Sequence, residues 1–305
     1  NGVPEDALYC ILGEGEVGSK IIQTQDIDLV AFTGSLRTAK IINKELSLKE
    51  GKIISLISET GGLNVMIVDS SALVERVSDD VLRSAFNSSG QRCSSLRILL
   101  IQKEIYSETL KMIIGAIERL NIGSPFLPET DIGPIINKSR VKDLGNYVEK
   151  FKKNKKITYQ AKLNPELSED YFPPTIIELD SLKEINEEEF GPILHVMPFL
   201  ESDLKVIINQ IEEKGFALTL GVHTRIDSKI SEISSLTSSG NLYVNRDIVG
   251  AVVESQPFGG NNLSGTGLKA GGPNYLIQFV NEKTTSINTV AIGGNPELLN
   301  KKSVT

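Results

Sequence analysis

The sequence predicts an α/β protein, and three observations support this class. Short apolar runs of strand length alternate with longer segments in which apolar residues recur at helical spacing. Several of the short runs are apolar on both faces, which is typical of strands buried in a parallel sheet. The chain has 305 residues, of which 40% are hydrophobic and 23% charged. This length and composition predict a globular protein with a large core and two subdomains, rather than a disordered or fibrous chain.

Charge and cysteine content argue against several classes of function. The net charge of -7 and the lack of basic blocks give no electrostatic reason to bind nucleic acid or an anionic membrane surface. No apolar stretch reaches the length of a membrane span and the N-terminus lacks a signal-peptide pattern, so we expect a soluble, cytoplasmic protein. The two cysteines, Cys10 and Cys93, form no CxxC motif, and His195 and His223 do not cluster with them. We therefore expect no structural metal.

The first predicted elements are a short strand over 7–12, a glycine-rich turn over 13–18 and a helix over 19–23. The glycine spacing matches the fingerprint of dinucleotide-binding folds, which also needs an acidic residue at the end of the next strand. That strand, predicted over 28–32, leads instead into Thr33-Gly34-Ser35. A plain glycine turn between a strand and a helix explains the same residues, so both interpretations stay open.

Gly34 and Ser35 stand where this second strand meets a helix that begins near Leu36. The free backbone N–H groups at such a helix start can hold a phosphate, although a simply capped helix gives the same pattern. The next strand, predicted over 51–57, leads to Glu59. Ligands of open sheets bind beyond the carboxyl ends of the strands, so we expect Gly34, Ser35 and Glu59 to share one rim. Most glutamates are solvated surface charges, but this position also suits a general base.

The middle of the chain continues as alternating strands and helices around one thiol. Strands are predicted over 64–68, 96–101 and 193–198, and helices over 72–86, 104–120, 138–151 and 202–214. Cys93 lies between two of these elements in a polar, glycine-containing turn. A cysteine is more often a small buried hydrophobe than a nucleophile, whereas an element boundary suits a positioned, reachable thiol. Since no histidine is adjacent, a nucleophilic Cys93 would need another activating group.

Three later segments each allow two interpretations. The acidic triplet 187–189 precedes Phe190 and is either solvated surface or part of a fixed loop whose ring packs on a flat ligand. The glycine-rich stretch 250–273 is either a flexible linker or backbone that closely approaches a ligand or another segment. Residues 279–290 are predicted to form a hairpin-like or extended tail, whose edges stay exposed unless it pairs with another subunit.

Five motifs occur in the order and spacing of the aldehyde dehydrogenase superfamily, which the chain therefore resembles. They are Phe32-Thr33-Gly34-Ser35, Glu59-Thr60-Gly61-Gly62-Leu63-Asn64, Gly90-Gln91-Arg92-Cys93, Glu188-Glu189-Phe190-Gly191-Pro192 and Pro257-Phe258-Gly259-Gly260. Finer features over 243–246, 249–253 and 263–273 resemble the L-glutamate-γ-semialdehyde (Δ1-pyrroline-5-carboxylate) dehydrogenase module of bifunctional proline utilization A. The tail residues 292–295 also resemble that subgroup.

The resemblance implies a fold, a cofactor and a mechanism. The fold would be aldehyde dehydrogenase-like: part of a Rossmann-type NAD domain over 1–62, an α/β catalytic domain over 63–260, and a return segment with an oligomerisation tail over 261–305. Cys93 would attack the aldehyde, and Glu59 would activate the water that hydrolyses the thioester. The cofactor would be NAD, with Gly34 and Ser35 near the pyrophosphate, Glu59 and Glu188 lining its site, and Phe190 near the nicotinamide.

The same resemblance implies a substrate anchor. Ser94 and the backbone of Gly250 and Ala251 would hold the α-carboxylate of the semialdehyde, while Phe258 would pack on its aliphatic chain. Such a site selects a carboxylate mostly through neutral donors. One departure is that Glu254 stands where the subgroup usually has glycine. We expect its side chain to point outward, because a carboxylate that faced the substrate would repel it.

Family members begin well before Asn1, so we expect this chain to correspond to a C-terminal portion. The part that precedes it in the family supplies the first strands of the cofactor domain and the asparagine of the oxyanion hole. We therefore expect weak NAD binding and little turnover by this polypeptide alone. Its expected partners are a small aldehyde, further copies of the chain, and a proline dehydrogenase domain upstream. The alternatives are a dehydrogenase for another semialdehyde, or a catalytically silent fragment that acts as a scaffold or split half.

Overall fold

The computed structural model describes residues 2–24 and 26–288. The chain forms two compact units, Asn1–Tyr275 and Leu276–Thr305, and each is described by itself. In the described part of the second unit, the regular structure is one 3₁₀ helix, η5 (Leu276–Phe279). The first unit contains all the other helices and strands described below, and it carries the candidate site.

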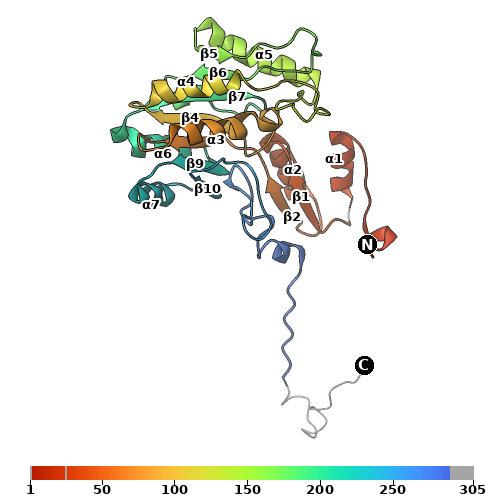
Figure 1. The fold of residues 1–305 in the computed structure, drawn as a ribbon. Coiled ribbons are helices and arrows are strands. Elements are labelled where there is room, and N and C mark those ends of the chain that lie inside the picture. The colour runs from red at the N-terminus through yellow and green to blue at the C-terminus, as the bar shows by residue number, and fades with distance from the viewer. Residues whose placement is uncertain (1, 25, 289–305) are drawn as a thin grey trace. The chain divides into compact units, whose positions relative to one another are not determined.

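The first unit is an α/β structure, as the alternating pattern predicts (Figure 1). Its strands are β1 (Leu29–Thr33), β2 (Ser55–Glu59), β3 (Asn64–Val68), β4 (Leu96–Gln102), β5 (Ile157–Gln160), β6 (Thr175–Glu178), β7 (Ile193–Phe199), β8 (Phe216–Ala217), β9 (Thr219–His223), β10 (Asn241–Val244) and β11 (Asn261–Asn262). Its α-helices are α1 (Gly15–Gln23), α2 (Leu36–Leu48), α3 (Val74–Phe86), α4 (Tyr106–Ile117), α5 (Lys138–Lys153), α6 (Leu204–Glu212) and α7 (Asp227–Leu236). Short 3₁₀ helices are η1 (Glu5–Ala7), η2 (Asn87–Gly90), η3 (Leu182–Glu184) and η4 (Glu201–Asp203).

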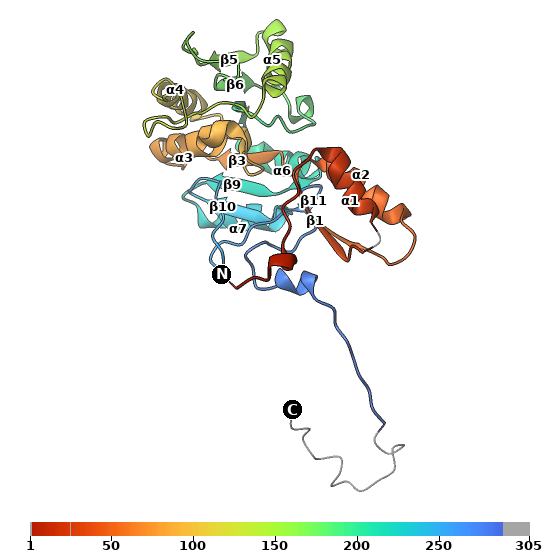
Figure 2. The ribbon, with the colours of Figure 1, turned by 90° about the vertical axis from the view of Figure 1, so that its right-hand side faces the viewer.

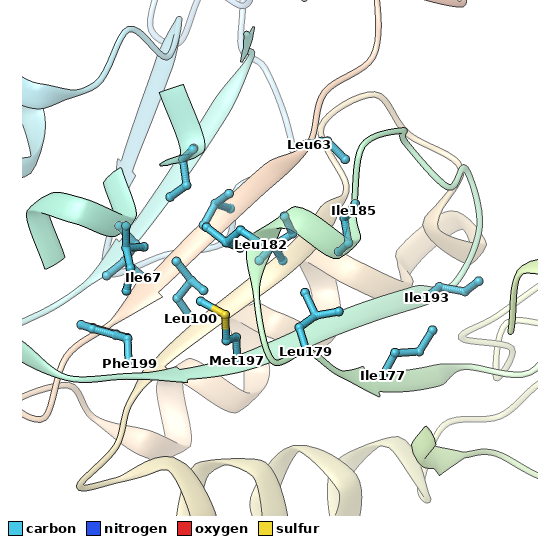
Figure 3. Packing of buried hydrophobic residues seen from close by; sticks show 14 of the residues in the cluster. Leu63, Ile67, Leu100, Ile177, Leu179, Leu182, Ile185, Ile193, Met197 and Phe199 are labelled. Atoms are coloured by element: carbon cyan, nitrogen blue, oxygen red, sulfur yellow. The ribbon is translucent and has the colours of Figure 1, made fainter. Parts of the chain in front are cut away.

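The main sheet has seven strands in the order β10-β9-β3-β4-β7-β6-β5. Its neighbours are parallel except β5, which runs antiparallel to β6. Because side chains alternate across a strand, Met66 and Val68 of β3 join the core under α3 and α4. Val65 and Ile67 face the other core, which α5, α6 and α7 cover, and part of which Figure 3 shows. Both faces of the sheet are therefore buried, which explains why β3 and β4 are apolar apart from Asn64, Arg97 and Gln102.

A separate two-stranded parallel sheet, β1 and β2, has its own small core with α1 and α2 (Figure 2). Ile22, Ile42, Leu46 and Ile54 are the buried members of that core. The end of β2 is held by the loop 263–266, where the backbone of Thr60 donates to Ser264 and that of Thr266 donates to Ser58. This loop fixes the carboxyl end of β2, and Glu59 with it.

Three predictions about elements were wrong. Residues 7–12 form no strand, since η1 ends at Ala7 and the exposed residues after it have no neighbouring strand to pair with among the described residues. The helix predicted over 19–23 begins already at Gly15, so most of the glycine turn predicted over 13–18 is helical. The strand predicted over 51–57 begins only at Ser55, because Gly51 has a left-handed φ of 102° and Ile53 is 98% exposed.

The tail over 279–290 was predicted to be hairpin-like or extended. Within the described residues it forms no hairpin, and the backbone after η5 has no helix or strand. Residues 289–290 and 292–295 lie outside the described residues.

Candidate active site

The candidate site is a cleft of about 620 Å³ between the carboxyl ends of β1 and β2 and the segments that precede β4 and β7. It brings together residues from far apart in the sequence. Its lining consists of Thr33, Gly34, Ser35, Glu59, Thr60, Gly61, Gln91, Arg92, Cys93, Arg140, Glu188, Phe190, Phe258 and Ala270. The expectation that the site lies beyond the carboxyl ends of the strands therefore holds for the two-stranded sheet. The thiol of Cys93, in contrast, lies at the amino end of the seven-stranded sheet, because it precedes β4.

Seven of the residues predicted for a site line this cleft together: Gly34, Ser35, Glu59, Cys93, Glu188, Phe190 and Phe258. The predicted anchor residues Ser94, Gly250 and Ala251 are not among the lining residues. Ser94 is buried, while Gly250 and Ala251 are exposed in a loop. Glu254 is exposed, as expected from the sequence. The glycine-rich turn 13–18 is not part of the cleft either, since Gly15 and Gly18 lie within α1.

Cys93 is held by a side chain that the sequence analysis did not single out. Nδ2 of Asn64 donates to the carbonyl oxygens of Cys93 at 2.7 Å and of Ser95 at 2.8 Å. Its Oδ1 accepts from the backbone N–H of Thr219 at 3.2 Å. Asn64 thus ties the thiol turn to β3 and β9. A buried asparagine as the first residue of an otherwise apolar strand is the sequence signal that could have identified it.

Burial raises the pKa of the Cys93 thiol above its ordinary value. The nearby carboxylate of Glu188 raises it further, and that of Glu59 adds a smaller effect in the same direction. The backbone N–H groups of Ser94 and of Cys93 itself donate toward the sulfur and lower the pKa. The raising effects prevail, so the free chain holds a neutral thiol at neutral pH and needs a base to form the thiolate.

Glu59 ends β2, where it pairs with Thr33 of β1 and forms an isolated bridge with Gly265. Its Oε2 accepts from the N–H of Gly260 at 3.5 Å, while Oε1 is buried without a hydrogen-bond partner among the described residues. Burial raises the pKa of Glu59 to about 6, against the lowering effects of Gly260 and of the Lys269 ammonium. A carboxylate with this pKa is ionised at neutral pH yet basic enough to accept a proton.

Glu188 is held in place by a buried arginine that the sequence analysis also missed. Its Oε1 accepts from Nη2 of Arg97 at 2.9 Å, and the guanidinium carbon of Arg97 lies 5.5 Å from the centroid of the Phe190 ring. Burial raises the pKa of Glu188, and the Arg97 guanidinium opposes this effect. An arginine inside the apolar run of β4 is a visible sequence signal, since arginine is almost never fully buried unless it is paired.

The start of α2 has the features of an anion site. Ser35 is the N-cap, and its Oγ accepts from the backbone N–H of Thr38 at 3.2 Å. The first turn of the helix contains no acidic residue, so the positive end of the helix dipole is not neutralised from within. Gly34 and Ser35 line the cleft at this point. A pyrophosphate is the kind of group that such a helix start binds.

Gly61 gives a prediction for the geometry of the site. A Cβ atom at this position would lie 1.6 Å from Oε2 of Glu188, so the carboxylate must move in a Gly61→Ala variant. We expect the variant to lose about 1–3 kcal/mol of unfolding free energy, measured by urea denaturation, because of overpacking. Glu188→Ala leaves the buried Arg97 guanidinium without its counter-charge and is destabilising by itself. In that background the clash is absent, so we expect the additional cost of Gly61→Ala to be smaller than in the parent.

The matched control for this variant is Gly115→Ala, in the exposed interior of α4, where an added Cβ meets nothing within 4 Å. Alanine there is expected to stabilise the chain by up to about 1 kcal/mol. Equal effects of the two glycine substitutions would contradict the contact between Gly61 and Glu188.

The sequence profile of the aldehyde dehydrogenase family matches residues 1–285, and the chain belongs to this family.

Among curated relatives, the bifunctional protein PutA of Klebsiella aerogenes is 44% identical over 294 residues, which are 92% of this chain and 22% of PutA. The 1-pyrroline-5-carboxylate dehydrogenase of Bacillus subtilis is 33% identical over 292 residues, which are 93% of this chain and 56% of that protein. The chain thus spans less than a quarter of this PutA and about half of this monofunctional enzyme.

Solved structures agree with these relatives. A crystal structure of a Bradyrhizobium japonicum proline utilization A mutant is 45% identical and superposes with a TM-score of 0.91, over 96% of this chain and 30% of that one. The structure of 1-pyrroline-5-carboxylate dehydrogenase from Thermus with bound NAD is 30% identical, with a TM-score of 0.78, over 88% of this chain and 52% of that one. The predicted kinship with the dehydrogenase region of PutA is therefore confirmed.

In the described part of the chain, no helix is long and apolar enough to cross a membrane. The same part also contains no group of three or more histidine, cysteine, aspartate or glutamate side chains arranged to hold a metal ion.

Proposed function

We propose that this chain carries the thiol site of an NAD-dependent L-glutamate-γ-semialdehyde (Δ1-pyrroline-5-carboxylate) dehydrogenase, which forms glutamate in proline catabolism. The observation that carries the proposal is that Cys93, Glu59, Glu188 and Phe190 line one cleft, although they come from three separate segments. The similarity to PutA and to 1-pyrroline-5-carboxylate dehydrogenases over more than nine-tenths of the chain supports the choice of substrate.

In the first step, the sulfur of Cys93 attacks the aldehyde carbon. The thiol is neutral in the free chain, so its proton passes to a base. We assign this role to the ionised carboxylate of Glu59, because its Oε1 has no hydrogen-bond partner among the described residues, whereas Oε1 of Glu188 is paired with Arg97. A C–S bond forms and the carbonyl oxygen becomes an oxyanion. The N–H groups of Cys93 and Ser94 donate toward the sulfur and therefore stabilise the thiolate that attacks.

In the second half of the reaction, Glu59 acts on water. A bound NAD supplies the hydride acceptor that oxidises the thiohemiacetal on Cys93 to a thioester. Glu59 releases the thiol proton to solvent and, ionised again, takes a proton from a water molecule, so that the resulting hydroxide adds to the thioester carbon. The C–S bond breaks, so Cys93 is regenerated and glutamate leaves with the new oxygen in its γ-carboxylate.

The residues of the cleft fit NAD by their chemistry. The start of α2 offers backbone donors without an acidic residue in its first turn, which suits the pyrophosphate. Glu188 is a carboxylate acceptor for ribose hydroxyls, with Oε1 engaged by Arg97. Phe190 exposes 36% of its surface and offers a ring face to the nicotinamide. Gly34, Ser35, Glu59, Glu188 and Phe190 are therefore the residues that we propose for the cofactor.

For the substrate, we propose that Phe258 packs on the aliphatic chain and that the loop with Gly250 and Ala251, together with Ser94, anchors the α-carboxylate. Phe258 lines the cleft, while the hydroxyl of Tyr243 donates to the carbonyl of Gly250 at 3.2 Å and holds the loop. Because Ser94 is buried and the two loop residues lie outside the cleft lining, this anchor requires a local movement when the substrate binds.

The wider organisation is also part of the proposal. We propose that 1–62 contributes to the NAD-binding domain, that 63–260 forms the catalytic domain, and that 261–305 returns to β2 and continues into a tail that joins copies of the chain. By analogy with PutA, a proline dehydrogenase domain would act in the same polypeptide as this segment.

A substrate test uses reversible protection of Cys93 in a Cys10→Ser background. L-glutamate-γ-semialdehyde is expected to protect Cys93 from iodoacetamide at a concentration about tenfold lower than butanal, which lacks the α-carboxylate. NADH formation by the same sample is expected to be slow or absent. Equal protection by the two aldehydes would favour another substrate, and robust NADH formation would contradict the low activity of this chain by itself.

A second function, as half of a split dehydrogenase, is favoured by one specific observation. Large apolar side chains around the two-stranded sheet are exposed, among them Leu12 at 89% and Ile53 at 98%. Exposed apolar surface of this kind is usual where another chain or segment packs. Restoration of NADH formation by an added N-terminal half of a related dehydrogenase would support this function, whereas unchanged activity would leave a silent scaffold role.

A further inference from the structure

Arg97 is a buried charged residue whose guanidinium makes four hydrogen bonds. It lies in the middle strand β4, it is 1% exposed, and its guanidinium contacts acceptors from two separate segments. Nη1 donates to the carbonyl oxygens of Gly90 at 2.8 Å and of Gly191 at 3.1 Å. Nη2 donates to the carbonyl of Arg92 at 3.1 Å and to Oε1 of Glu188 at 2.9 Å. One side chain therefore joins the thiol segment 90–93 to the segment 188–191.

The two segments also touch directly. Gly90 has a left-handed φ of 65°, and a Cβ atom there would lie 2.2 Å from the carbonyl oxygen of Gly191. Glycine is thus required at position 90 by both its conformation and the closeness of the facing backbone. Because the two segments lie this close together, Nη1 of Arg97 can donate to the carbonyl oxygens of both Gly90 and Gly191.

Arg97 is supported from behind by a buried hydrogen-bond chain. Nδ1 of His195 lies 2.9 Å from the carbonyl oxygen of Arg97, and Nε2 lies 2.9 Å from the hydroxyl of Tyr147. A carbonyl can only accept, so the proton is on Nδ1 and Nε2 accepts from the tyrosine. Burial lowers the pKa of His195 to about 4, which keeps the ring neutral. The hydrogen bonds from Tyr147 in α5 to His195 in β7, and from His195 to the carbonyl of Arg97, thereby fix the backbone of Arg97.

We infer that Arg97 is a positioning residue, which locks the nucleophile segment 90–93 against the cofactor-facing segment 188–191 and so sets the placement of Cys93 relative to Glu188. The inference rests on the proposed roles of these two residues. Arginine suits the task because its planar fork can donate to several acceptors at fixed angles, which a lysine ammonium does not reproduce. Glu188 supplies the opposite charge that a buried guanidinium requires.

The hydrogen bonds by which Arg97 joins the segments 90–93 and 188–191 are called the clamp below. Loss of the clamp has two consequences at the sulfur of Cys93. Arg97 and the thiolate of Cys93 attract each other, while Glu188 and Glu59 repel the thiolate. Removal of the guanidinium therefore leaves the carboxylates uncompensated and disfavours the thiolate. The segment 90–93 also loses two of its anchors, so the sulfur becomes easier to reach.

The test measures iodoacetamide alkylation of Cys93 against pH in the full chain with Cys10→Ser. Arg97→Lys and Arg97→Gln are expected to raise the midpoint of the profile by about one pH unit, less for lysine, and to raise the high-pH rate about tenfold. Arg119→Lys, an exposed arginine after α4, is the matched control and is expected to change neither quantity. Folded Arg97 variants with the same midpoint as the parent and a high-pH rate within twofold of it would overturn the inference.

Glu188→Gln keeps the test decisive if the Arg97 variants do not fold. This variant retains the three carbonyl contacts but removes the repulsion, so the midpoint is expected to fall by about one pH unit with little change in the high-pH rate. Glu187→Gln, at an exposed neighbouring position, is its control. A midpoint at or above that of the parent would overturn the inference. These readouts need no dehydrogenase activity, so a failed semialdehyde protection test would refute the proposed substrate without affecting the clamp.

Discussion

Replacing Glu59 with glutamine is expected to leave Cys93 able to accept an acyl group from p-nitrophenyl acetate, more slowly because a buffer base must then take the thiol proton, and to slow the release of that group further, by about 10²–10⁴-fold. The ester acylates the sulfur and expels p-nitrophenolate, so no cofactor is needed. Release requires a base for the attacking water, and Glu59 is the cleft carboxylate whose pKa is about 6. In the parent, the release rate is expected to fall as the pH drops through about 6, because the base becomes protonated.

Rapid mixing separates the two phases of this reaction. Glu59→Gln is expected to show a burst of p-nitrophenolate followed by very slow turnover, while Glu50→Gln, an exposed glutamate before β2, behaves like the parent. Steady turnover of Glu59→Gln at the parent rate would show that another group activates the water.

The second large effect concerns stability against pH. Burial lowers the pKa of His195 from 6.5 to about 4, so the folded chain resists protonation of this ring while the unfolded chain accepts it. The contribution is fully present above about pH 6.5 and is lost as the pH falls toward 4, which amounts to about 2 kcal/mol between pH 7 and pH 5. His195→Asn keeps a donor for the carbonyl of Arg97 but cannot titrate.

Urea unfolding at pH 7 and pH 5 gives the difference between the two proteins. The parent is expected to lose about 2 kcal/mol more than His195→Asn on acidification. Glu59 acts in the opposite sense, because its raised pKa favours the folded state at low pH, but it is present in both proteins and cancels in the comparison. The same pH dependence in both proteins would show that His195 does not titrate as proposed.

Local pattern predicted three of the seven strands of the main sheet. The runs that became β3, β4 and β7 are mostly apolar because both faces of these strands are buried. The pattern did not reveal β5, β6, β9, β10 or the helix α7. At 7–12 and at Ile53 apolar residues are exposed, and their composition resembles a strand although no described strand pairs with them.

The residues of the site that belong to motifs were predicted, whereas the residues that support them through long-range contacts were not. Motif order pointed to Cys93, Glu59, Glu188 and Phe190, and the structure places all four in one cleft. The pairing of Arg97 with Glu188 spans 91 residues, and no local rule connects an arginine in a strand to a particular distant carboxylate. The hydrogen bond between His195 and Tyr147 also joins residues that are distant in the sequence, so local pattern did not reveal the structural role of this histidine.

The central claim is that Cys93 and Glu59 form one thiol site, and its most direct test is the location of the acyl group. After the Glu59→Gln variant reacts with p-nitrophenyl acetate, peptide mapping by mass spectrometry is expected to find a persistent acetyl group on Cys93, which the parent loses by hydrolysis. An acetyl group on Cys10 or elsewhere, with Cys93 unmodified, would contradict the account.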